Sequence, residues 1–258
     1  MSQKSHPPIW VSQNFLTSAK TIRRLIRKTS ITTNDHVIEI GPGKGHITAI
    51  LLQACNKVSA IEIDKTLYEK LQYKYEAASN LRLYHQDFLK WNLPSTGPYK
   101  VFANIPFNHT TNIITKLTQA NNPPTEAWLV VEKGAAKRFM GIPRENSHSL
   151  FLKPQFDMRI IYHFSRDDFH PMPGVDVVLL HIKMKSPHDI PSQEWRRYQN
   201  FISNATKNNG TGLPRLFTKK QWTKARKLAG LTDQTSAEIL YIQWLCLFRC
   251  YRIYSRPI

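Results

Sequence analysis

Three glycines at alternate positions follow an apolar run with an acid at its next-to-last position, and they form a candidate ligand-binding loop. The run is Val37-Ile38-Glu39-Ile40, and the loop reads Gly41-Pro42-Gly43-Lys44-Gly45-His46. The apolar run predicts a buried strand, and the helical spacing of apolar residues after the loop predicts a helix over 45–54. Because glycine tolerates positive φ and lets a ligand approach bare main chain, the loop is suited to binding a small molecule.

A second acid-terminated strand extends this unit. Val58-Ser59-Ala60-Ile61-Glu62 is apolar, and Glu62 lies 21 residues after Gly41. A carboxylate here can accept hydrogen bonds from both hydroxyls of a ribose, which indicates a nucleotide-binding βαβ unit. His46 replaces the third glycine of a dinucleotide-binding loop, and Gly45 replaces the Ser or Thr of a triphosphate-binding loop. S-adenosylmethionine, which has a ribose but no phosphate, fits best; a dinucleotide and a purely structural turn remain alternatives.

The third expected strand ends on Asp87 and Phe88. Open α/β sheets bind ligands at the carboxyl ends of their strands. Asp87 can accept a hydrogen bond from an adenine amino group there, while Phe88 or Ile63 lies on the adenine ring. The alternative is that Asp87 is an ordinary helix cap or turn residue.

The stretch with the most specific chemistry is Asn104-Ile105-Pro106-Phe107. The exocyclic amine of adenine is a poor nucleophile, because its lone pair is delocalised into the ring. The side-chain oxygen of Asn104 and the backbone carbonyl of Ile105 can accept its two hydrogens and turn the lone pair toward a methyl donor. Pro106 fixes the turn, and Phe107 offers a face to a base lifted from its stack. Such a transfer depends on positioning and electrostatics, without a metal; the competing interpretation is a proline turn after a strand.

Alternating and apolar segments predict a doubly wound α/β domain with a seven-stranded sheet. The expected strands lie at 36–40, 57–62, 81–88, 99–104, 127–132, 156–164 and 177–185. After the linker 186–191 the strand patterns stop, and helices are expected at 195–206, 219–228 and 236–248. The predicted domains are therefore a catalytic domain over residues 1–185 and a small basic helical domain over 186–258.

The charge balance is the strongest global signal. The 258 residues include 36 Lys and Arg against 18 Asp and Glu, a net charge of +18. This excess indicates a polyanionic partner, most simply nucleic acid, although a basic solvated surface is the alternative. Candidate RNA contacts lie on a helix that begins after Thr17 or Ser18 and on a second, shorter helix. They are Arg23, Arg24, Arg27 and Lys28 on the first and Lys133, Lys137 and Arg138 on the second.

The three cysteines, Cys55, Cys246 and Cys250, form no paired motif. They indicate a reduced compartment and no structural metal. No stretch is long and apolar enough to span a bilayer, and residues 1–10 do not resemble a secretory signal. We expect a cytoplasmic protein and, by default, a monomer.

Taken together, the motifs resemble the ribosomal RNA adenine-N6 dimethyltransferase superfamily, and within it the Erm methyltransferases of the macrolide–lincosamide–streptogramin B resistance branch. The matching stretches cover most of the chain. They are Ser12-Gln13-Asn14-Phe15-Leu16, Glu39 to His46, Glu62-Ile63-Asp64, Gln86-Asp87-Phe88, Asn104 to Phe107, Val130 to Gly134, Phe169-His170-Pro171-Met172-Pro173 and Leu216 to Trp222.

The resemblance implies a Rossmann-like methyltransferase domain with a small helical C-terminal domain. It implies S-adenosylmethionine as donor, one adenine of protein-free or partly assembled 23S rRNA near the macrolide site as acceptor, and antibiotic resistance as the outcome. The family's base-stacking position maps onto Phe107. Its donor contacts map onto Asn14, Leu16, Gly41, Glu62, Asp87 and Asn104, and the predicted donor site also includes Gly43, Ile63 and Phe88.

Two other functions remain open: a small-subunit rRNA dimethyltransferase, and a non-catalytic RNA-binding relative of the same fold. The first typically has Asn-Leu-Pro-Tyr where this chain has Asn104 to Phe107, and loss of Asn104 or Gly41 would favour the second. The Erm motif ends more often in Tyr, so Phe107 keeps the ring and loses the hydroxyl. The chain also departs from the family at Val177 and over 205–212.

Overall fold

A computed structural model of the protein describes residues 14–207, 212–232 and 238–254. Contacts within the chain divide it into two compact units. The first consists of the residues up to 136 together with 159–184, and the second of 137–158 together with the residues from 185 onward. The domain boundary expected after residue 185 stays a prediction; by contacts, residues 137–158 group with the C-terminal residues.

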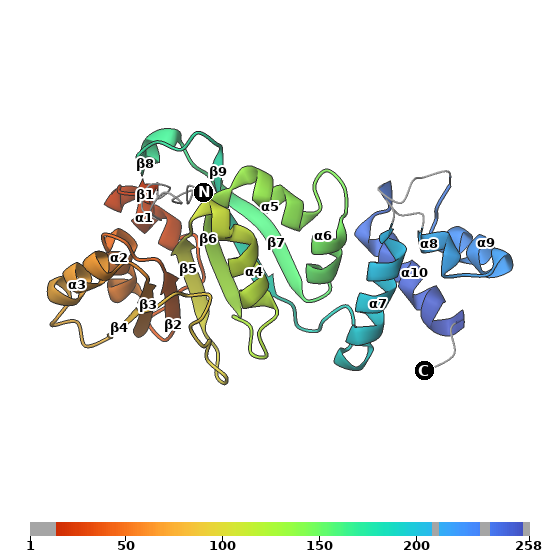
Figure 1. The fold of residues 1–258 in the computed structure, drawn as a ribbon, viewed down its shortest axis with the longest axis horizontal. Coiled ribbons are helices and arrows are strands. Elements are labelled where there is room, and N and C mark those ends of the chain that lie inside the picture. The colour runs from red at the N-terminus through yellow and green to blue at the C-terminus, as the bar shows by residue number, and fades with distance from the viewer. Residues whose placement is uncertain (1–13, 208–211, 233–237, 255–258) are drawn as a thin grey trace, which may run out of the picture. The chain divides into compact units, whose positions relative to one another are not determined.

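A mixed seven-stranded sheet forms the centre of the first unit (Figure 1), with the strand order β4-β3-β2-β5-β6-β9-β7. Its strands are β2 (His36–Ile40), β3 (Lys57–Glu62), β4 (Leu81–His85), β5 (Lys100–Asn104), β6 (Glu126–Glu132), β7 (Phe156–His163) and β9 (Val177–Met184). All seven correspond to strands expected from the sequence, which confirms the Rossmann-like α/β class.

The parallel strands bring the candidate site residues to one edge of the sheet. Strands β4, β3, β2, β5 and β6 are parallel neighbours, and β9 runs antiparallel to β6. The backbone N–H of Gly41 donates to the Ile61 carbonyl at 2.9 Å, and that of Gln86 donates to the Glu62 carbonyl at 2.9 Å. The segments that follow β2, β3 and β4 therefore leave the sheet side by side.

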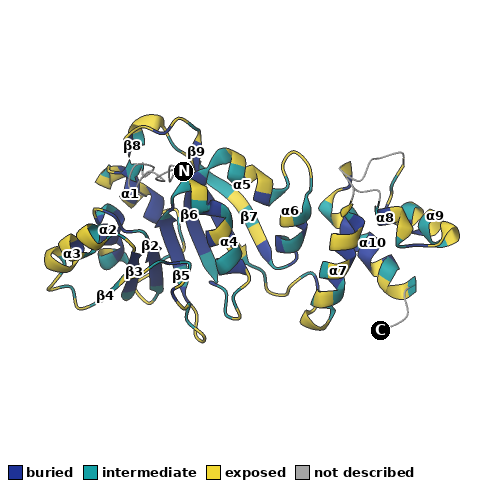
Figure 2. Cartoon of the chain, viewed as in Figure 1, coloured by how far each residue is buried: buried dark blue, intermediate teal, exposed yellow. Residues whose placement is uncertain are grey.

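Helices cover the sheet and bury its apolar residues (Figure 2). α1 (Ala19–Ile26) and α2 (His46–Ala54) pack on one face, where Ile22, Leu25 and Leu51 join a single core cluster. Among the described residues of this unit, the remaining helices are α3 (Lys65–Lys74), the 3₁₀ turn η2 (Phe107–His109), α4 (Thr110–Thr118) and the 3₁₀ turn η3 (Arg166–Asp168). Ser18 caps α1 by accepting the Thr21 N–H at 3.2 Å, which confirms one of the two expected N-caps.

A small second sheet, which the sequence did not indicate, joins the N-terminal segment to a distant loop. β1 (Phe15–Leu16) pairs antiparallel with β8 (Phe169–His170). The side chains of Leu16 and Phe169 are buried at 2% and 3% exposure. Thr21 Oγ1 donates to Asp168 Oδ1 at 3.1 Å, which ties α1 to the same loop.

The second unit is helical and has its own core, in which Tyr198, Phe201, Trp244 and Phe248 are at most 2% exposed. α5 (Lys133–Met140) crosses from the first unit into the second. The other elements are α6 (Ser147–Leu152), the 3₁₀ turn η4 (Ser192–Glu194), α7 (Trp195–Ala205), α8 (Gly212–Arg215), α9 (Lys219–Leu228) and α10 (Tyr241–Tyr254).

The last helix differs from the expectation of 236–248. α10 starts at Tyr241 and continues to Tyr254, because Cys250, Tyr251 and Tyr254 pack on the core beyond the expected end. The short helix α8 was not expected. Parts of the motif at 12–16, of the segment 205–212 and of the expected helix at 236–248 lie outside the described residues. No helix within the described ranges is long and apolar enough to cross a membrane.

Candidate active site

A cavity of about 180 Å³ opens at the carboxyl ends of β2, β3 and β4. Five of the predicted donor contacts line it: Gly41, Glu62, Ile63, Asp87 and Phe88. Pro106 lies in the same wall, so the cavity reaches the predicted catalytic tetrapeptide. The cavity is mostly apolar and carries two carboxylates, which suits an aromatic base joined to a polyhydroxylated ring.

The Glu62 carboxylate is held in place by backbone donors from two loops. Glu62 Oε2 accepts the Gly43 N–H and Oε1 accepts the Asp64 N–H, each at 2.9 Å. Burial raises the pKa of Glu62, while these hydrogen bonds oppose the rise. Each oxygen keeps a further lone pair, so the carboxylate can still accept hydrogen bonds from two ribose hydroxyls.

The position of Asp87 is compatible with both roles that the sequence left open, a turn residue and a ligand contact. Its Oδ1 accepts the Leu89 N–H at 2.9 Å, as in a turn, while the residue also lines the cavity. The Phe88 ring is 6% exposed and packs on Trp91 at 6.4 Å between centroids. Ile63 is 43% exposed, so it offers the more open apolar surface to a bound ring.

Two glycines of the loop need their small size for different reasons. Gly41 has φ +66° and nothing within 4 Å of its missing Cβ, so its main chain is bare. Gly43 has φ +57°, and a Cβ there would meet Cε1 of the Phe15 ring at 2.7 Å. The Lys44 ammonium lies 5.2 Å from the centroid of the same ring. Gly43 therefore acts through its N–H to Glu62 and its contact with Phe15, and it does not line the cavity.

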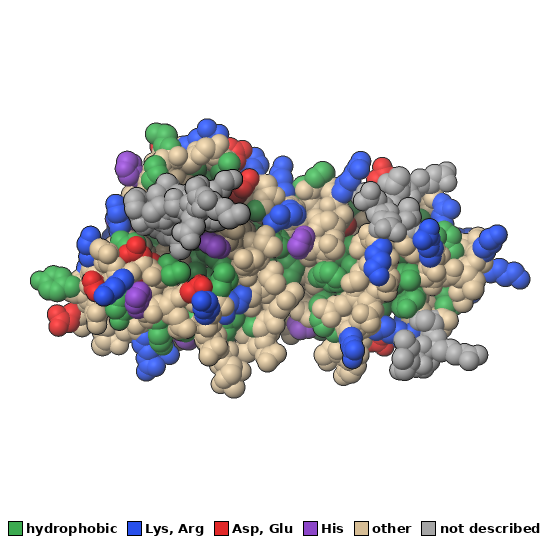
Figure 3. Space-filling view, viewed as in Figure 1, with side chains coloured by type: hydrophobic (Ala, Val, Ile, Leu, Met, Phe, Trp, Pro, Cys, Tyr) green, Lys and Arg blue, Asp and Glu red, His purple; other side chains and the backbone are tan. Residues whose placement is uncertain are grey.

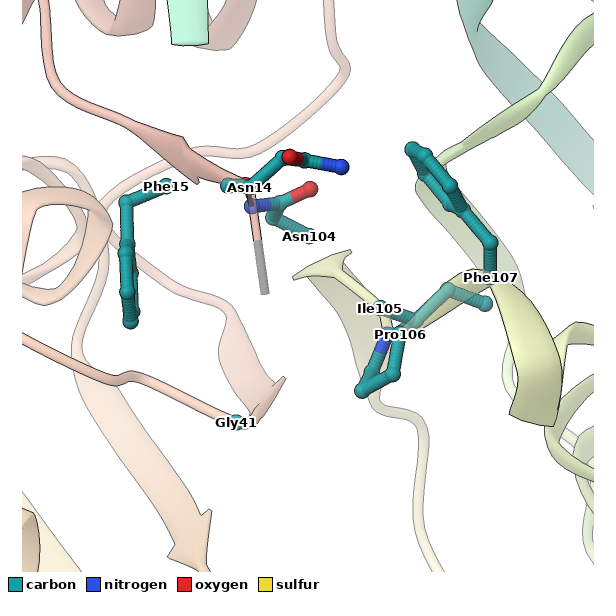
Figure 4. Close-up of a pocket in the computed structure, with 7 residues that line it drawn as sticks. All are labelled: Asn14, Phe15, Gly41, Asn104, Ile105, Pro106 and Phe107. Carbon is teal, nitrogen blue, oxygen red and sulfur yellow. Dashed lines mark hydrogen bonds between the residues drawn. The ribbon is translucent and has the colours of Figure 1, made fainter. Parts of the chain in front are cut away.

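A second, smaller pocket adjoins the cavity and contains the tetrapeptide (Figure 4). Asn14, Phe15, Gly41 and the residues Asn104 to Phe107 line it, so Gly41 and Pro106 are shared by both pockets. Asn104 Nδ2 donates to the Asn14 carbonyl at 2.8 Å. This bond fixes the Asn104 side-chain amide with Nδ2 toward the Asn14 carbonyl and Oδ1 directed away from it.

The turn after Asn104 leaves one backbone acceptor free. The Pro106 carbonyl accepts the His109 N–H at 3.0 Å, and the Phe107 carbonyl accepts Thr110 Oγ1 at 3.0 Å. No hydrogen bond to the Ile105 carbonyl occurs within the part of the chain that the structure describes. Asn104 Oδ1 and the Ile105 carbonyl are thus the two acceptors of the tetrapeptide that remain available to an amine.

A buried acid lies in the strand that leads to the glycine loop. Glu39 is 1% exposed, and among the described residues neither of its carboxyl oxygens has a hydrogen-bond partner. Burial raises the pKa of Glu39 to about 8. Its carboxyl group is therefore mainly protonated at neutral pH and is part of the core, not of the cavity wall.

Seven residues that line the two pockets were not predicted as site residues. Phe15 borders the smaller pocket, and the other six border the larger one: Ile40, Ile61, Gln86, Leu89, His109 and Ile113. The turn η2 directs the chain back over the cavity after Phe107, so that α4 contributes to its wall. The sequence feature that could have indicated His109 as a site residue is its position two residues after the tetrapeptide.

The structure does not bring every predicted residue to the site. The Leu16 side chain is 2% exposed and belongs to the core cluster under α1 and α2. Arg23, Arg24, Arg27 and Lys28 are exposed on α1 or directly after it. The Arg24 guanidinium contacts the Tyr162 hydroxyl and lies 4.9 Å from the centroid of that ring.

The three basic residues predicted on α5 differ in their contacts. Lys133 pairs with Asp176 at 3.4 Å, which reduces its availability to phosphate. Lys137 and Arg138 fall in the second compact unit. The Arg138 guanidinium lies 5.2 Å from the centroid of the Phe139 ring.

The five parallel strands of the sheet, the glycine loop and the strand-end carboxylates define a Rossmann-like α/β fold with a ligand cavity at the strand ends. Residues 9–249 match the family model described as ribosomal RNA adenine dimethylase, and the chain belongs to this family. Membership confirms the resemblance to the ribosomal RNA adenine dimethyltransferase superfamily and the class of enzyme that the sequence predicts.

Curated relatives match along nearly their whole length. One from Lysinibacillus sphaericus, named rRNA adenine N-6-methyltransferase, is 38% identical over 244 residues, covering 95% of this chain and 96% of the relative. One of the same name from Limosilactobacillus reuteri is 36% identical over 245 residues, covering 95% and 97%. The solved structure of the 23S rRNA methyltransferase ErmE has a TM-score of 0.83 at 24% identity, covering 93% of this chain and 100% of that one. The last comparison supports the fold.

Proposed function

We propose that the protein transfers a methyl group from S-adenosylmethionine to N6 of one adenine in 23S rRNA near the macrolide site. Modification there would confer resistance to macrolides, lincosamides and streptogramin B. The observation that carries the proposal is the Asn104 amide, whose nitrogen is bound to the Asn14 carbonyl beside the cavity of Gly41, Glu62 and Asp87. The Erm-type resemblance supports the choice of the large-subunit RNA.

The donor fits the larger cavity by its polar groups. Glu62 accepts hydrogen bonds from the ribose hydroxyls, and Asp87 accepts one from the adenine amino group. Ile63 lies against the adenine ring. The bare main chain at Gly41 allows close approach of the methionine part. When bound, S-adenosylmethionine supplies an activated methyl group on a sulfonium.

Asn104 and Ile105 orient the acceptor amine. Asn104 Oδ1 and the Ile105 carbonyl accept the two N6 hydrogens, so that the nitrogen lone pair points toward the donor methyl group. With the donor bound, its sulfonium would supply the methyl group to N6, and the amine would release one proton to solvent. Phe107 stacks on the extruded adenine and holds it in this position. The residues contribute orientation and electrostatic stabilisation.

The basic surface after Ser18 is suited to the RNA backbone. Lys20, Arg23, Arg24, Arg27 and Lys28 border one shallow surface hollow of the first unit. None of the five forms an ion pair within the described residues, so their charges are available to phosphates. We also propose Lys137 and Arg138 as RNA contacts, and a monomeric, cytoplasmic enzyme acting on protein-free or partly assembled RNA.

Incubation with labelled S-adenosylmethionine and protein-free rRNA tests the proposal. We expect label in 23S rRNA at one adenine near the macrolide site and none in 16S rRNA. Label confined to 16S rRNA would contradict the large-subunit assignment. Absence of label from both RNAs, with the donor still bound in a calorimetric titration, would contradict the methyl transfer itself.

A further inference from the structure

The loop that carries β8 differs in charge from the rest of the chain. The whole protein has twice as many Lys and Arg as Asp and Glu, yet residues 165–176 contain three acids, Asp167, Asp168 and Asp176, and one base, Arg166. Figure 3 shows acidic and basic side chains close together along the part of the first unit where Figure 1 labels β8 and β9. A surface of mixed sign does not attract a polyanion strongly, which indicates another role for these acids.

Two of these acids bind partners of different kinds. Asp176 pairs with the Lys133 ammonium at 3.4 Å, so it balances a charge. Asp168 binds uncharged donors: its Oδ2 accepts the Ser165 N–H at 3.0 Å, and its Oδ1 accepts the Thr21 hydroxyl at 3.1 Å. The Asp168 carboxylate therefore joins its own loop to the first turn of α1.

This bond lies directly beside the pairing of β1 with β8. Thr21 is 8% exposed, and its backbone N–H donates to Ser18 Oγ at 3.2 Å, so the first turn of α1 is well fixed. β8 begins at Phe169, one residue after Asp168, and β1 ends at Leu16, two residues before Ser18. A ladder of two residues on each strand has little stability of its own. The bond between Thr21 and Asp168 therefore helps to fix the register of this ladder.

The register of β1 decides the direction of the Asn14 carbonyl. Phe15 pairs with His170, and the Asn14 carbonyl belongs to the same planar peptide group as the Phe15 N–H. Asn104 Nδ2 donates to this carbonyl at 2.8 Å, and Figure 4 shows the two side chains next to each other. An amide has an acceptor at one end and a donor at the other, and a rotation of 180° exchanges them. Without the Asn14 carbonyl, Asn104 would also present Nδ2 to the target amine, a donor facing a donor.

We propose that Thr21 and Asp168 are positioning residues for methyl transfer, which hold the Asn104 amide in its productive orientation through the β1–β8 pair. This inference rests on the proposed function, in which Asn104 Oδ1 accepts a hydrogen of the adenine amine. Neither Thr21 nor Asp168 lines either of the two pockets. Their loss should therefore lower kcat and leave the affinity for the donor largely unchanged.

Methyl transfer to total rRNA by the full-length chain, with donor binding measured by calorimetry, tests this inference. Thr21→Val removes the hydroxyl at nearly constant volume and should lower kcat about threefold to tenfold, the value of one hydrogen bond. Thr21→Ser keeps the hydroxyl and should restore kcat. Thr118→Val is the matched control and should keep kcat, because Thr118 is also buried on a helix and donates its hydroxyl within α4, to the Ile114 carbonyl at 2.7 Å.

Two further measurements separate positioning from a general loss of packing. Asn104→Ala has no amide to orient, so adding Thr21→Val to it should not lower kcat further. Hydrogen–deuterium exchange of the segments 14–18 and 166–171 follows the β1–β8 pair without methyl transfer. Exchange there should be faster in Thr21→Val and Asp168→Ala than in the wild type, and unchanged in Thr21→Ser.

The outcomes distinguish this inference from the proposed function. The inference is overturned by an unchanged kcat in Thr21→Val, by an equal fall in Thr118→Val, or by an equal further fall in the Asn104→Ala background. Unchanged exchange of the two segments in Thr21→Val also overturns it, whether or not the protein methylates RNA. A wild type that labels no rRNA, while exchange responds as expected, contradicts the proposed function and leaves the bond between Thr21 and Asp168 in its structural role. Because total rRNA is the acceptor, the choice between the two ribosomal subunits does not affect the result.

Discussion

Replacing Glu39 with Gln should make the stability of the protein less dependent on pH. Glu39 is fully buried beside α2, and burial raises its pKa to about 8 from 4.5. The folded protein therefore keeps a proton on this carboxyl group over a range in which the unfolded chain has released it. Gln has nearly the same shape and does not titrate, so Glu39→Gln removes this proton linkage and leaves the volume of the core intact.

The expected magnitude follows from the two pKa values. Below pH 4.5 both states of the wild type are protonated, and above about pH 8 both are ionised. Between them, folding becomes less favourable as pH rises, by about 1.4 kcal/mol per pH unit for one proton. From pH 5.5 to 8, the free energy of unfolding of the wild type should fall by about 3 kcal/mol relative to Glu39→Gln.

Urea unfolding followed by circular dichroism at steps between pH 5.5 and 8 measures this difference. Glu62, whose pKa burial also raises, is present in both proteins, so its desolvation is common to both and only its electrostatic interaction with Glu39 differs. Glu76→Gln, at an exposed position, should follow the wild type. Parallel pH profiles for the wild type and Glu39→Gln would refute the conclusion that Glu39 is buried in its protonated form.

Substitutions at three further positions test the candidate site: Gly43 in the adjoining loop, and His109 and Phe107 in the walls of the two pockets. Gly43→Ala adds a Cβ that meets the Phe15 ring and disfavours φ +57° by about 1–2 kcal/mol; calorimetry should show donor binding about tenfold weaker, and unchanged affinity would contradict the packing. His109→Ala should weaken donor binding about threefold to tenfold by opening the cavity wall, and His109→Ile should restore it if packing is the cause. Phe107→Ala should lower kcat/KM on rRNA about tenfold to a hundredfold by loss of base stacking, while Phe107→Tyr stays near wild type; equal activity of all three proteins would exclude stacking.

The sequence predicts the strands of the large sheet and several of the strand-end residues that line the larger cavity, because these signals are local. Each strand of the large sheet is a short apolar or alternating run, and Glu62 and Asp87 directly follow or end such runs. In a parallel sheet the strand ends meet at one edge. Placing these carboxylates in one site therefore requires the order of the strands but no detail of side-chain packing.

What could not be predicted depends on contacts between distant segments. The pairing of β1 with β8 joins two strands of two residues each, far apart in the chain, and neither is long enough to show a periodic pattern. The bond from Asn104 to the Asn14 carbonyl depends on that pairing. The full burial of Glu39 likewise arises from α2 packing on the sheet, since an acid within an apolar run has no sequence feature that fixes its protonation.

The identity of the methylated atom tests the central claim most directly. RNA from reactions of the wild type and of Asn104→Ala is digested to nucleosides and analysed by mass spectrometry, with donor binding measured for both proteins. We predict N6-methylated adenosine from the wild type, and from Asn104→Ala a rate lower by about 10² to 10³ with donor affinity largely kept. Methylation at another atom or base, or full activity of Asn104→Ala, would contradict the role of the Asn104 amide in orienting the adenine amine.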